Sequence, residues 1–160
     1  MKLWLIRHAE AVEADEFSGS DLERPLTSGG RRSAQAAFSS LARVRSGPSL
    51  VISSNAVRAW ETARIFCLAF GIPDYQRNRL LNPGCSFSAM KKIVEAIPDD
   101  CAFAAIVGHE PDLSGAVSLW TSGGRLSLVL KKGGVVELDI RRDGTVDLVM
   151  AFPPDILNIF

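Results

Sequence analysis

Four residues of the sequence have the chemistry to bind and attack a phosphate group. Arg7 and His8 follow directly after a short apolar run, and His109, the only other histidine, follows a second one. Arg58 lies in the stretch SSNAVRAWETA. Arginine holds phosphate oxygens through charge-assisted hydrogen bonds of about 1.5–3 kcal/mol each, and a neutral imidazole is a nucleophile. These residue types indicate phosphate chemistry, provided that the fold brings them together.

Arg58 is predicted at a helix position that disfavours a positive charge. Ser53, Ser54 and Asn55 can cap a helix that begins near Ala56, which puts Arg58 in the first turn. The helix dipole disfavours a cation there by about 0.3–1 kcal/mol. An anion on the helix N-terminus would reverse the sign of that interaction. A guanidinium that reaches out to solvent is the alternative for Arg58 taken alone.

Apolar residues recur with a strand-like period and a helix-like period in alternation. Strands are predicted over residues 2–7, 49–53, 76–81 and 101–108. Helices are predicted after the cap Thr27, over residues 56–70, between Ser86 and Pro98, and from Pro111 onward. The last 35 residues or so contain strand-like runs separated by the turn signals Gly133-Gly134 and Asp143-Gly144, which predicts a β-meander.

This order predicts an α/β fold, a three-layer α/β/α sandwich in one domain over residues 1–160. Its central sheet should be mostly parallel, with antiparallel C-terminal strands at an edge. Ligands of open α/β sheets bind beyond the carboxyl ends of the strands. Because Arg7, His8 and His109 all follow strands, we expect them at the same edge of the sheet.

Composition excludes several classes of protein. Charged residues make up 22% of the chain and the formal net charge is zero, which is not the basic balance of a general nucleic-acid binder. No apolar run is long enough for a signal peptide or a membrane span. The three cysteines form no CxxC pair, so we expect neither a disulfide framework nor a zinc site. A cytoplasmic protein without metal or other cofactor is expected.

Four motifs resemble those of a known family in both order and spacing. They are RHAEA, RPLTSGG, SSNAVRAWETA and IVGHEPDLS, within roughly residues 1–120. The sequence is similar to the histidine phosphatase superfamily, and most similar to its SixA-type branch of protein-phosphohistidine phosphatases. The resemblance implies a phosphoglycerate-mutase-like fold and a role in signal transduction.

The resemblance also implies residue roles. His8 would attack phosphorus and carry a transient phosphoryl group, while Arg7, Arg58 and His109 would surround its equatorial oxygens. The other nitrogen of His8 needs a hydrogen bond that fixes the tautomer, and we expect a backbone carbonyl in the following loop to provide it.

Two further residues are assigned to substrate binding. They are Arg24, in RPLT, and Glu110, beside His109. A salt bridge to the acidic loop 10–23 is an equal alternative for Arg24.

The segment RLLNPGCSFSAM (79–90) contains no Asp or Glu, whereas larger members of the superfamily carry a general-acid carboxylate shortly after the third strand. An alkoxide leaving group needs such an acid, whose loss costs about 10²–10⁴-fold in rate. Imidazole can leave phosphohistidine already protonated. The segment therefore favours a phosphohistidine-bearing protein, a phosphotransfer domain or phosphocarrier, as substrate.

Other interpretations stay open. An acid of loop 10–23 could donate the missing proton, although solvation of a mobile loop is the simpler expectation. A phosphatase for small phosphate esters and a non-catalytic phosphate-binding module are the functional alternatives. A metal hydrolase using His8, Glu10, His109 and Glu110 lacks the HxH or HExxH spacing. Lys131 and Lys132 are either solvated or in contact with an acidic partner protein.

Overall fold

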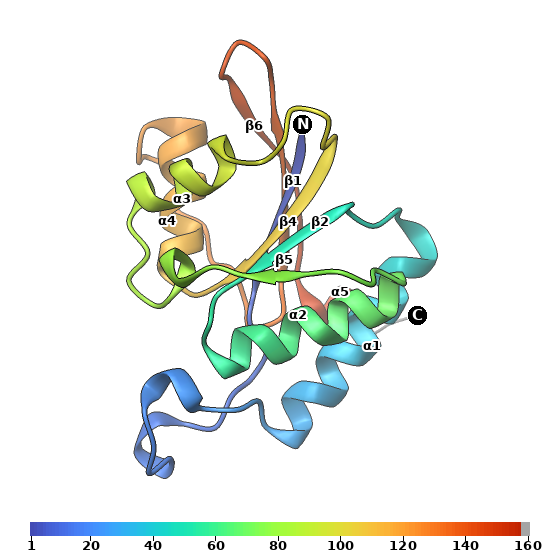
Figure 1. The fold of residues 1–160 in the computed structure, drawn as a ribbon, viewed down its shortest axis with the longest axis vertical. Coiled ribbons are helices and arrows are strands. Elements are labelled where there is room, and N and C mark those ends of the chain that lie inside the picture. Colours follow the sequence, from blue (N-terminus) through green and yellow to red (C-terminus); the bar gives the residue numbers. More distant parts are fainter. Residues whose placement is uncertain (158–160) are drawn as a thin grey trace.

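The computed structural model describes residues 1–157 and contains one six-stranded sheet with helices on both faces (Figure 1). The strands are β1 (Lys2–Arg7), β2 (Leu50–Ser53), β3 (Gln76–Arg77), β4 (Phe103–Gly108), β5 (Val135–Ile140) and β6 (Val146–Phe152). The α-helices are α1 (Ser28–Val44), α2 (Val57–Phe70), α3 (Phe87–Glu95), α4 (Asp112–Ser122) and α5 (Pro154–Leu157). Short 3₁₀ turns cover Ala14–Glu16 (η1), Asp21–Glu23 (η2) and Arg79–Leu81 (η3).

The sheet order is β3-β2-β4-β1-β5-β6. The first four of these strands run parallel, while β5 is antiparallel to β1 and β6 is antiparallel to β5. Helices α1, α2 and α5 lie on one side of the sheet in Figure 1, and α3 and α4 lie on the other. The predicted α/β/α sandwich with an antiparallel C-terminal edge is confirmed.

Alternate residues of the central strands enter two separate cores. In β1, Trp4 and Ile6 pack with residues of α1 and α2, whereas Leu3 and Leu5 pack with residues of α3 and α4. Both sets are at most 1% exposed. A strand covered on both faces is apolar at every position, which is why the run after Lys2 shows no polar alternation.

Cap residues mark the ends of the predicted helices. The side chains of Thr27 and Ser86 accept the backbone N–H groups of Gly30 and Ala89, as N-caps do. Gly71 ends α2 in the left-handed conformation, at a φ of 66° that favours glycine. Pro111 precedes α4 as its cap and is not its first residue.

Two predicted strands differ from the structure. The segment 76–81 is a strand only at Gln76–Arg77, because Asn78 accepts the N–H of Leu80 and turns the chain into η3. The strand-like run 126–132 forms no strand, and the meander has two strands instead of three. Leu130 of this run gives its carbonyl to the Arg7 side chain instead of to a sheet neighbour.

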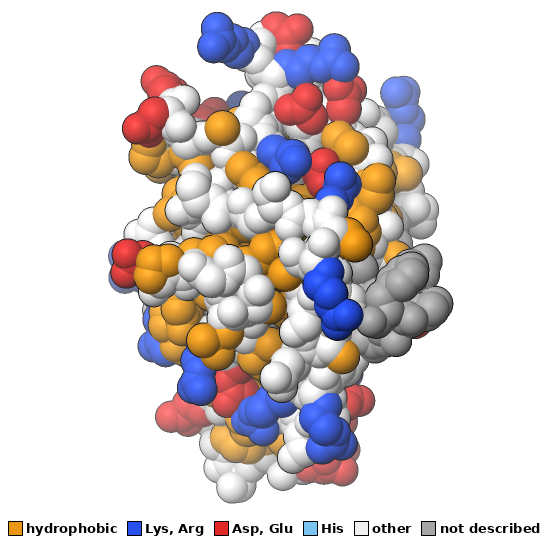
Figure 2. All heavy atoms as spheres, turned by 90° about the vertical axis from the view of Figure 1, so that its right-hand side faces the viewer, with side chains coloured by type: hydrophobic (Ala, Val, Ile, Leu, Met, Phe, Trp, Pro, Cys, Tyr) orange, Lys and Arg blue, Asp and Glu red, His pale blue; other side chains and the backbone are white. Residues whose placement is uncertain are grey.

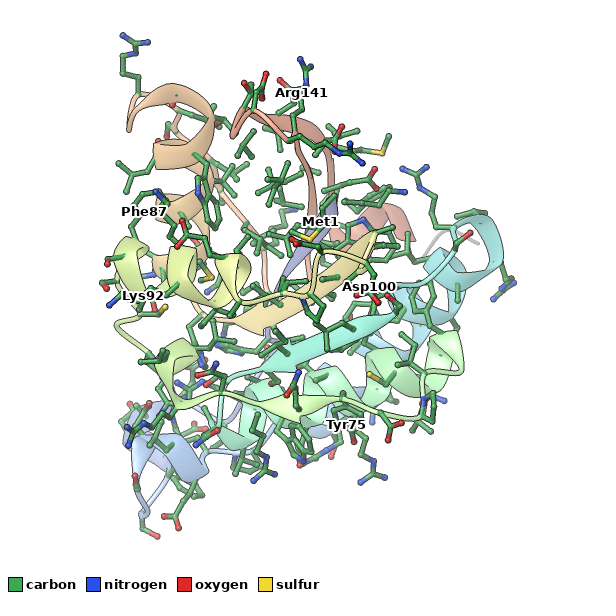
Figure 3. The ribbon with its side chains drawn as sticks, turned by 45° about the horizontal axis from the view of Figure 1, so that its top comes forward. Met1, Tyr75, Phe87, Lys92, Asp100 and Arg141 are labelled. Atoms are coloured by element: carbon green, nitrogen blue, oxygen red, sulfur yellow. The ribbon has the colours of Figure 1, made fainter. Side chains whose placement is uncertain are left out.

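The two ends of the sheet are occupied differently. Met1, Asp100 and Arg141, labelled in Figure 3, mark the end where β1 and β4 begin, and the Met1 amino group donates to the carbonyl of Ile140 there. The residues expected to carry the chemistry follow the other ends of these strands.

On the face shown in Figure 2, cationic and anionic side chains are interspersed, in keeping with the zero net charge. None of the described helices is long and apolar enough to cross a membrane.

The loop after β1 passes very close to the start of α1. A Cβ added to Gly30 would lie 2.1 Å from the carbonyl oxygen of Glu10, an atom that also accepts the N–H of Thr27. A Cβ added to Gly29 would meet only side-chain atoms at ordinary contact distance, the Glu10 carboxylate at 3.4 Å and the Thr27 hydroxyl at 3.7 Å.

We therefore expect Gly30→Ala to lower the free energy of unfolding by about 1–3 kcal/mol, as overpacking does. Gly29→Ala should be neutral or slightly stabilising, because alanine favours helix by about 1 kcal/mol over glycine. Chemical denaturation of the two variants measures the difference. Equal stabilities would mean that the Glu10 backbone moves without cost.

Candidate active site

The carboxyl ends of β1 and β4 bring the two histidines together. Arg7 ends β1 directly opposite Gly108, the last residue of β4, and the N–H of His8 donates to the Gly108 carbonyl at 3.0 Å. The His8 and His109 rings lie 5.1 Å apart between centroids. This is the end of the sheet from which the loop of residues 10–24 projects, at the lower left of Figure 1. The prediction that both histidines meet at one sheet edge is confirmed.

The tautomer of His8 is set by the backbone. Nδ1 lies 2.7 Å from the carbonyl oxygen of Ala9, and since a carbonyl only accepts, Nδ1 carries the proton and Nε2 a lone pair. The N–H of Ala9 donates to Thr62 of α2, which anchors this loop to the helix. The expected backbone carbonyl after the first strand is thus found.

Burial keeps His8 neutral. Burial is the largest cause that lowers the pKa of His8, to about 4, and the charges of Arg58, Arg7 and Lys132 lower it further, while the bond to Ala9 acts in the opposite sense. At neutral pH the ring therefore presents the uncharged Nε2 lone pair that a nucleophile needs.

The two arginines are held by their terminal nitrogens. Arg7 donates from Nη1 to the Leu130 carbonyl at 2.8 Å. Arg58, only 3% exposed, donates from Nη1 to the backbone oxygen and from Nη2 to the carboxylate of Asp21, at 2.6 and 2.9 Å. The Nε atoms of both arginines are buried and have no hydrogen-bond partner.

His109 has one engaged nitrogen and one without a partner. Its Nε2 lies 2.9 Å from Oγ of Ser54, and its Nδ1 is buried without a hydrogen bond. Burial first, then the charges of His8 and Arg58, lower the pKa of His109 to about 3.

Within residues 1–157, the buried side-chain nitrogen or oxygen atoms without a partner are Arg7 Nε, Arg58 Nε and His109 Nδ1. A buried polar atom left unsatisfied costs about 1–3 kcal/mol. All three atoms belong to residues predicted from the sequence to surround one phosphoryl group. An anionic ligand with several acceptor oxygens would accept from the two arginine Nε–H groups, and from His109 Nδ1 when that nitrogen carries a proton.

Arg24 and Glu110 have partners within the chain. Arg24 forms a salt bridge with Asp21, with Nη2 at 2.8 Å from the carboxylate, so the contact to the acidic loop exists. Glu110 accepts the N–H of Ser114 at 3.0 Å, at the start of α4. Their roles in substrate binding stay predictions.

Lys131 and Lys132 both have acidic partners within the chain. Lys132 lies 3.3 Å from Glu13, and Lys131 lies 2.7 Å from Asp155. Among the residues that the structure describes, no group of three or more His, Cys, Asp and Glu side chains is placed to hold a metal ion.

The sequence did not assign the contacts of three polar residues at the site. Asp21 of the acidic loop pairs with Arg58. Ser54, expected only as a helix cap, contacts Nε2 of His109 and donates to Asn82. Asn82 could have been suspected from the sequence, because it is a polar amide in the segment 79–90, where an acid was sought. Ser54 is not the N-cap of α2, a position held by Ala56, although its hydroxyl oxygen accepts the Ala56 N–H.

The lowered pKa values make the stability depend on pH. As the pH falls from about 6.5 toward 4, imidazoles of the unfolded chain gain protons before His8 and His109 of the folded chain do, so the folded state loses stability in this window. We expect a slope of at most about 1.4 kcal/mol per pH unit for each ring.

Denaturation of the wild type and His8→Gln between pH 4.5 and 6.5 measures this slope. The variant should show a shallower slope because one imidazole is gone. Parallel curves for the two proteins would contradict the neutral His8. Carboxyl groups titrate in both proteins, so they cancel in the comparison.

A family model described as histidine phosphatase superfamily (branch 1) matches residues 3–85. A search of curated protein sequences gives no match.

Many solved structures have a similar fold, and three of them illustrate the range of the likeness. The protein histidine phosphatase SixA complexed with tungstate is 18% identical with a TM-score of 0.88, over 98% of this chain and 99% of that one. The alpha-ribazole phosphatase from Shigella flexneri is 18% identical with a TM-score of 0.77, over 96% and 97%. A phosphoglycerate mutase from Bacillus anthracis is 12% identical with a TM-score of 0.76, over 98% and 94%.

At these identities the likeness to solved structures establishes the fold, which is that of the phosphoglycerate mutases. The family model covers just over half of the sequence, including Arg7, His8 and Arg58. The chain belongs to the histidine phosphatase superfamily, branch 1, and is a phosphatase.

Proposed function

We propose that this phosphatase hydrolyses phosphohistidine on a protein, through a covalent phosphohistidine intermediate on His8. The observation that carries the proposal is the set of three unpartnered buried nitrogens, Arg7 Nε, Arg58 Nε and His109 Nδ1, around a neutral imidazole. A protein with a phosphotransfer domain, or a phosphocarrier, is the proposed partner.

In the first step, Nε2 of His8 attacks phosphorus and the imidazole of the substrate leaves. Phosphoryl transfer has a loose transition state with charge spread over the equatorial oxygens, so it is catalysed mainly by positioning and electrostatics. Arg7 and Arg58 supply that charge. In the second step, water attacks phosphorus and His8 leaves as neutral imidazole, with its Nδ1 proton still held by Ala9.

The leaving group decides between substrates. The segment 79–90 has no acidic residue, and the loop acid at the site is Asp21. Burial alone would raise the pKa of Asp21, but the hydrogen bonds from Arg24 and Arg58 outweigh burial and lower this pKa below its usual value. An ionised carboxylate has no proton to donate to an alkoxide. This chemistry suits phosphohistidine better than the ester of an alcohol.

Replacing the nucleophile gives a direct test. His8→Ala should abolish turnover of a phosphohistidine protein while sulfate or tungstate still binds, because both arginines remain. The wild type should incorporate labelled phosphate in an acid-labile, base-stable form, and the variant should not. Residual activity above a few per cent in His8→Ala would rule out the covalent mechanism.

The rate should also depend steeply on the leaving group. A phosphohistidine protein and activated aryl phosphates should react, whereas alkyl phosphates should be slower by roughly 10²–10⁴-fold for lack of an acid. Initial rates on aryl phosphates of graded phenol pKa, at one pH, measure this dependence.

A flat dependence would show that chemistry does not limit the rate or that a proton donor is present. Asp21→Asn distinguishes these cases, since it removes the carboxylate that contacts Arg58. Alkyl phosphates that react as fast as phosphohistidine would support the alternative, a phosphatase for small esters.

A further inference from the structure

The amide group of Asn82 has a fixed orientation. Its side-chain oxygen lies 3.0 Å from the backbone nitrogen of Asn55. A backbone N–H can only donate, so the atom that faces it is the amide oxygen and not the amide NH₂. The same oxygen lies 3.1 Å from Oγ of Ser54.

The orientation of Asn82 determines where the Ser54 proton points. An amide oxygen only accepts, so the single hydroxyl proton of Ser54 is donated to Asn82. The Ser54 oxygen accepts the backbone N–H of Ala56 at 3.1 Å. With its proton engaged, Ser54 can only accept from Nε2 of His109, which lies 2.9 Å away. Nε2 of His109 therefore carries a proton.

The protonation of Nε2 determines the state of Nδ1, the other ring nitrogen of His109. In the neutral ring protonated at Nε2, Nδ1 has a lone pair, and this is the atom that is buried without a partner. The charged and titratable groups that act on the ring are His8, Arg58, Asp21 and Arg24. Burial, His8 and Arg58 favour the neutral ring and outweigh Asp21, which acts in the opposite sense.

A lone pair cannot donate to an anionic oxygen. For Nδ1 to bind a phosphoryl oxygen, a proton from solvent must form an N–H bond at Nδ1 and convert the ring to imidazolium. The opposite neutral tautomer would donate from Nδ1 without any proton uptake.

We propose that Asn82 is a positioning residue that fixes His109, through Ser54, in the tautomer protonated at Nε2, so that binding of a phosphoryl group takes up one proton on Nδ1. The inference rests on the proposed function for the identity of the ligand. Its test needs neither turnover nor a phosphohistidine substrate, so the two can fail separately.

The chain suits a spectroscopic test because it has only two histidines. Long-range ¹H–¹⁵N spectra of the full chain with labelled histidine report which ring nitrogen is protonated. At pH 7 without ligand, His8 should be protonated at Nδ1 and His109 at Nε2, and His8→Gln assigns the signals. A His109 ring protonated at Nδ1 in the free wild type would overturn the proposal.

Asn82→Ala frees the Ser54 proton to turn toward His109. We expect the His109 signals to change from one tautomer to a mixture. Asn82→Asp keeps an acceptor oxygen and should restore the single tautomer. Asn78→Ala is the matched control, since Asn78 lies in the same segment and accepts the N–H of Leu80. Unchanged His109 signals in a folded Asn82→Ala would refute the role of Asn82.

If Asn82→Ala does not fold, Ser54→Ala tests the same link. Removing the hydroxyl group takes away the acceptor for Nε2–H, so both tautomers should appear. A single Nε2-protonated tautomer in Ser54→Ala would show that Ser54 does not set it.

Sulfate is the probe for proton uptake, because it stays a dianion over the whole pH range used. Its affinity for the wild type should fall about tenfold per pH unit between pH 6 and 8, and spectra of the complex should show His109 protonated at both nitrogens. Asn82→Ala should show a shallower dependence and Asn78→Ala the wild-type one. A pH-independent affinity, or a proton that appears on His8 alone, would overturn the coupling.

Discussion

Two guanidinium groups are held beside a histidine that must stay neutral, and much of the local structure serves this arrangement. A buried charge is costly unless it is paired and hydrogen-bonded. Arg58 is paired through its terminal nitrogens with Asp21, and Arg7 with a single carbonyl, that of Leu130. The same charges lower the pKa of His8. One placement of cations therefore leaves donors for an anion and keeps the imidazole beside them neutral.

Main-chain groups set the geometry on which this placement depends. The parallel register of β1 and β4 fixes His8 next to His109, and the N–H of Gly133 donates to the carbonyls of Arg7 and His8. The antiparallel strands that follow Gly133 thus tie down the loop of the nucleophile. The two rings are also oriented in opposite senses, since His8 is held by its Nδ1–H and His109 by its Nε2. Each ring turns its other nitrogen, Nε2 of His8 and Nδ1 of His109, away from these contacts.

Site residues could be predicted from the sequence where they lie at the end of a regular strand or the start of a helix. Arg7 ends an apolar strand, and His8 and His109 each directly follow one, so the parallel order of the sheet was enough to bring them together. Arg58 could be found because it sits against the helix dipole. Asp21 and Asn82 could not be placed, because their contacts depend on the paths of loops that no periodicity describes. For the same reason the run 126–132 was predicted as a strand, although its Leu130 carbonyl serves Arg7.

The chemistry of residue 82 links substrate choice to the organisation of the site. The resemblance to the superfamily led us to look for a general-acid carboxyl group in the segment 79–90, which contains no Asp or Glu. Asn82 of this segment holds no titratable proton and accepts from Ser54 and the backbone of Asn55. Asp21, the carboxylate that does reach the site, is ionised and engaged by two arginines. Neither Asn82 nor the ionised Asp21 can donate a proton, which supports the proposed function, because the imidazole of a phosphohistidine leaves with its own proton.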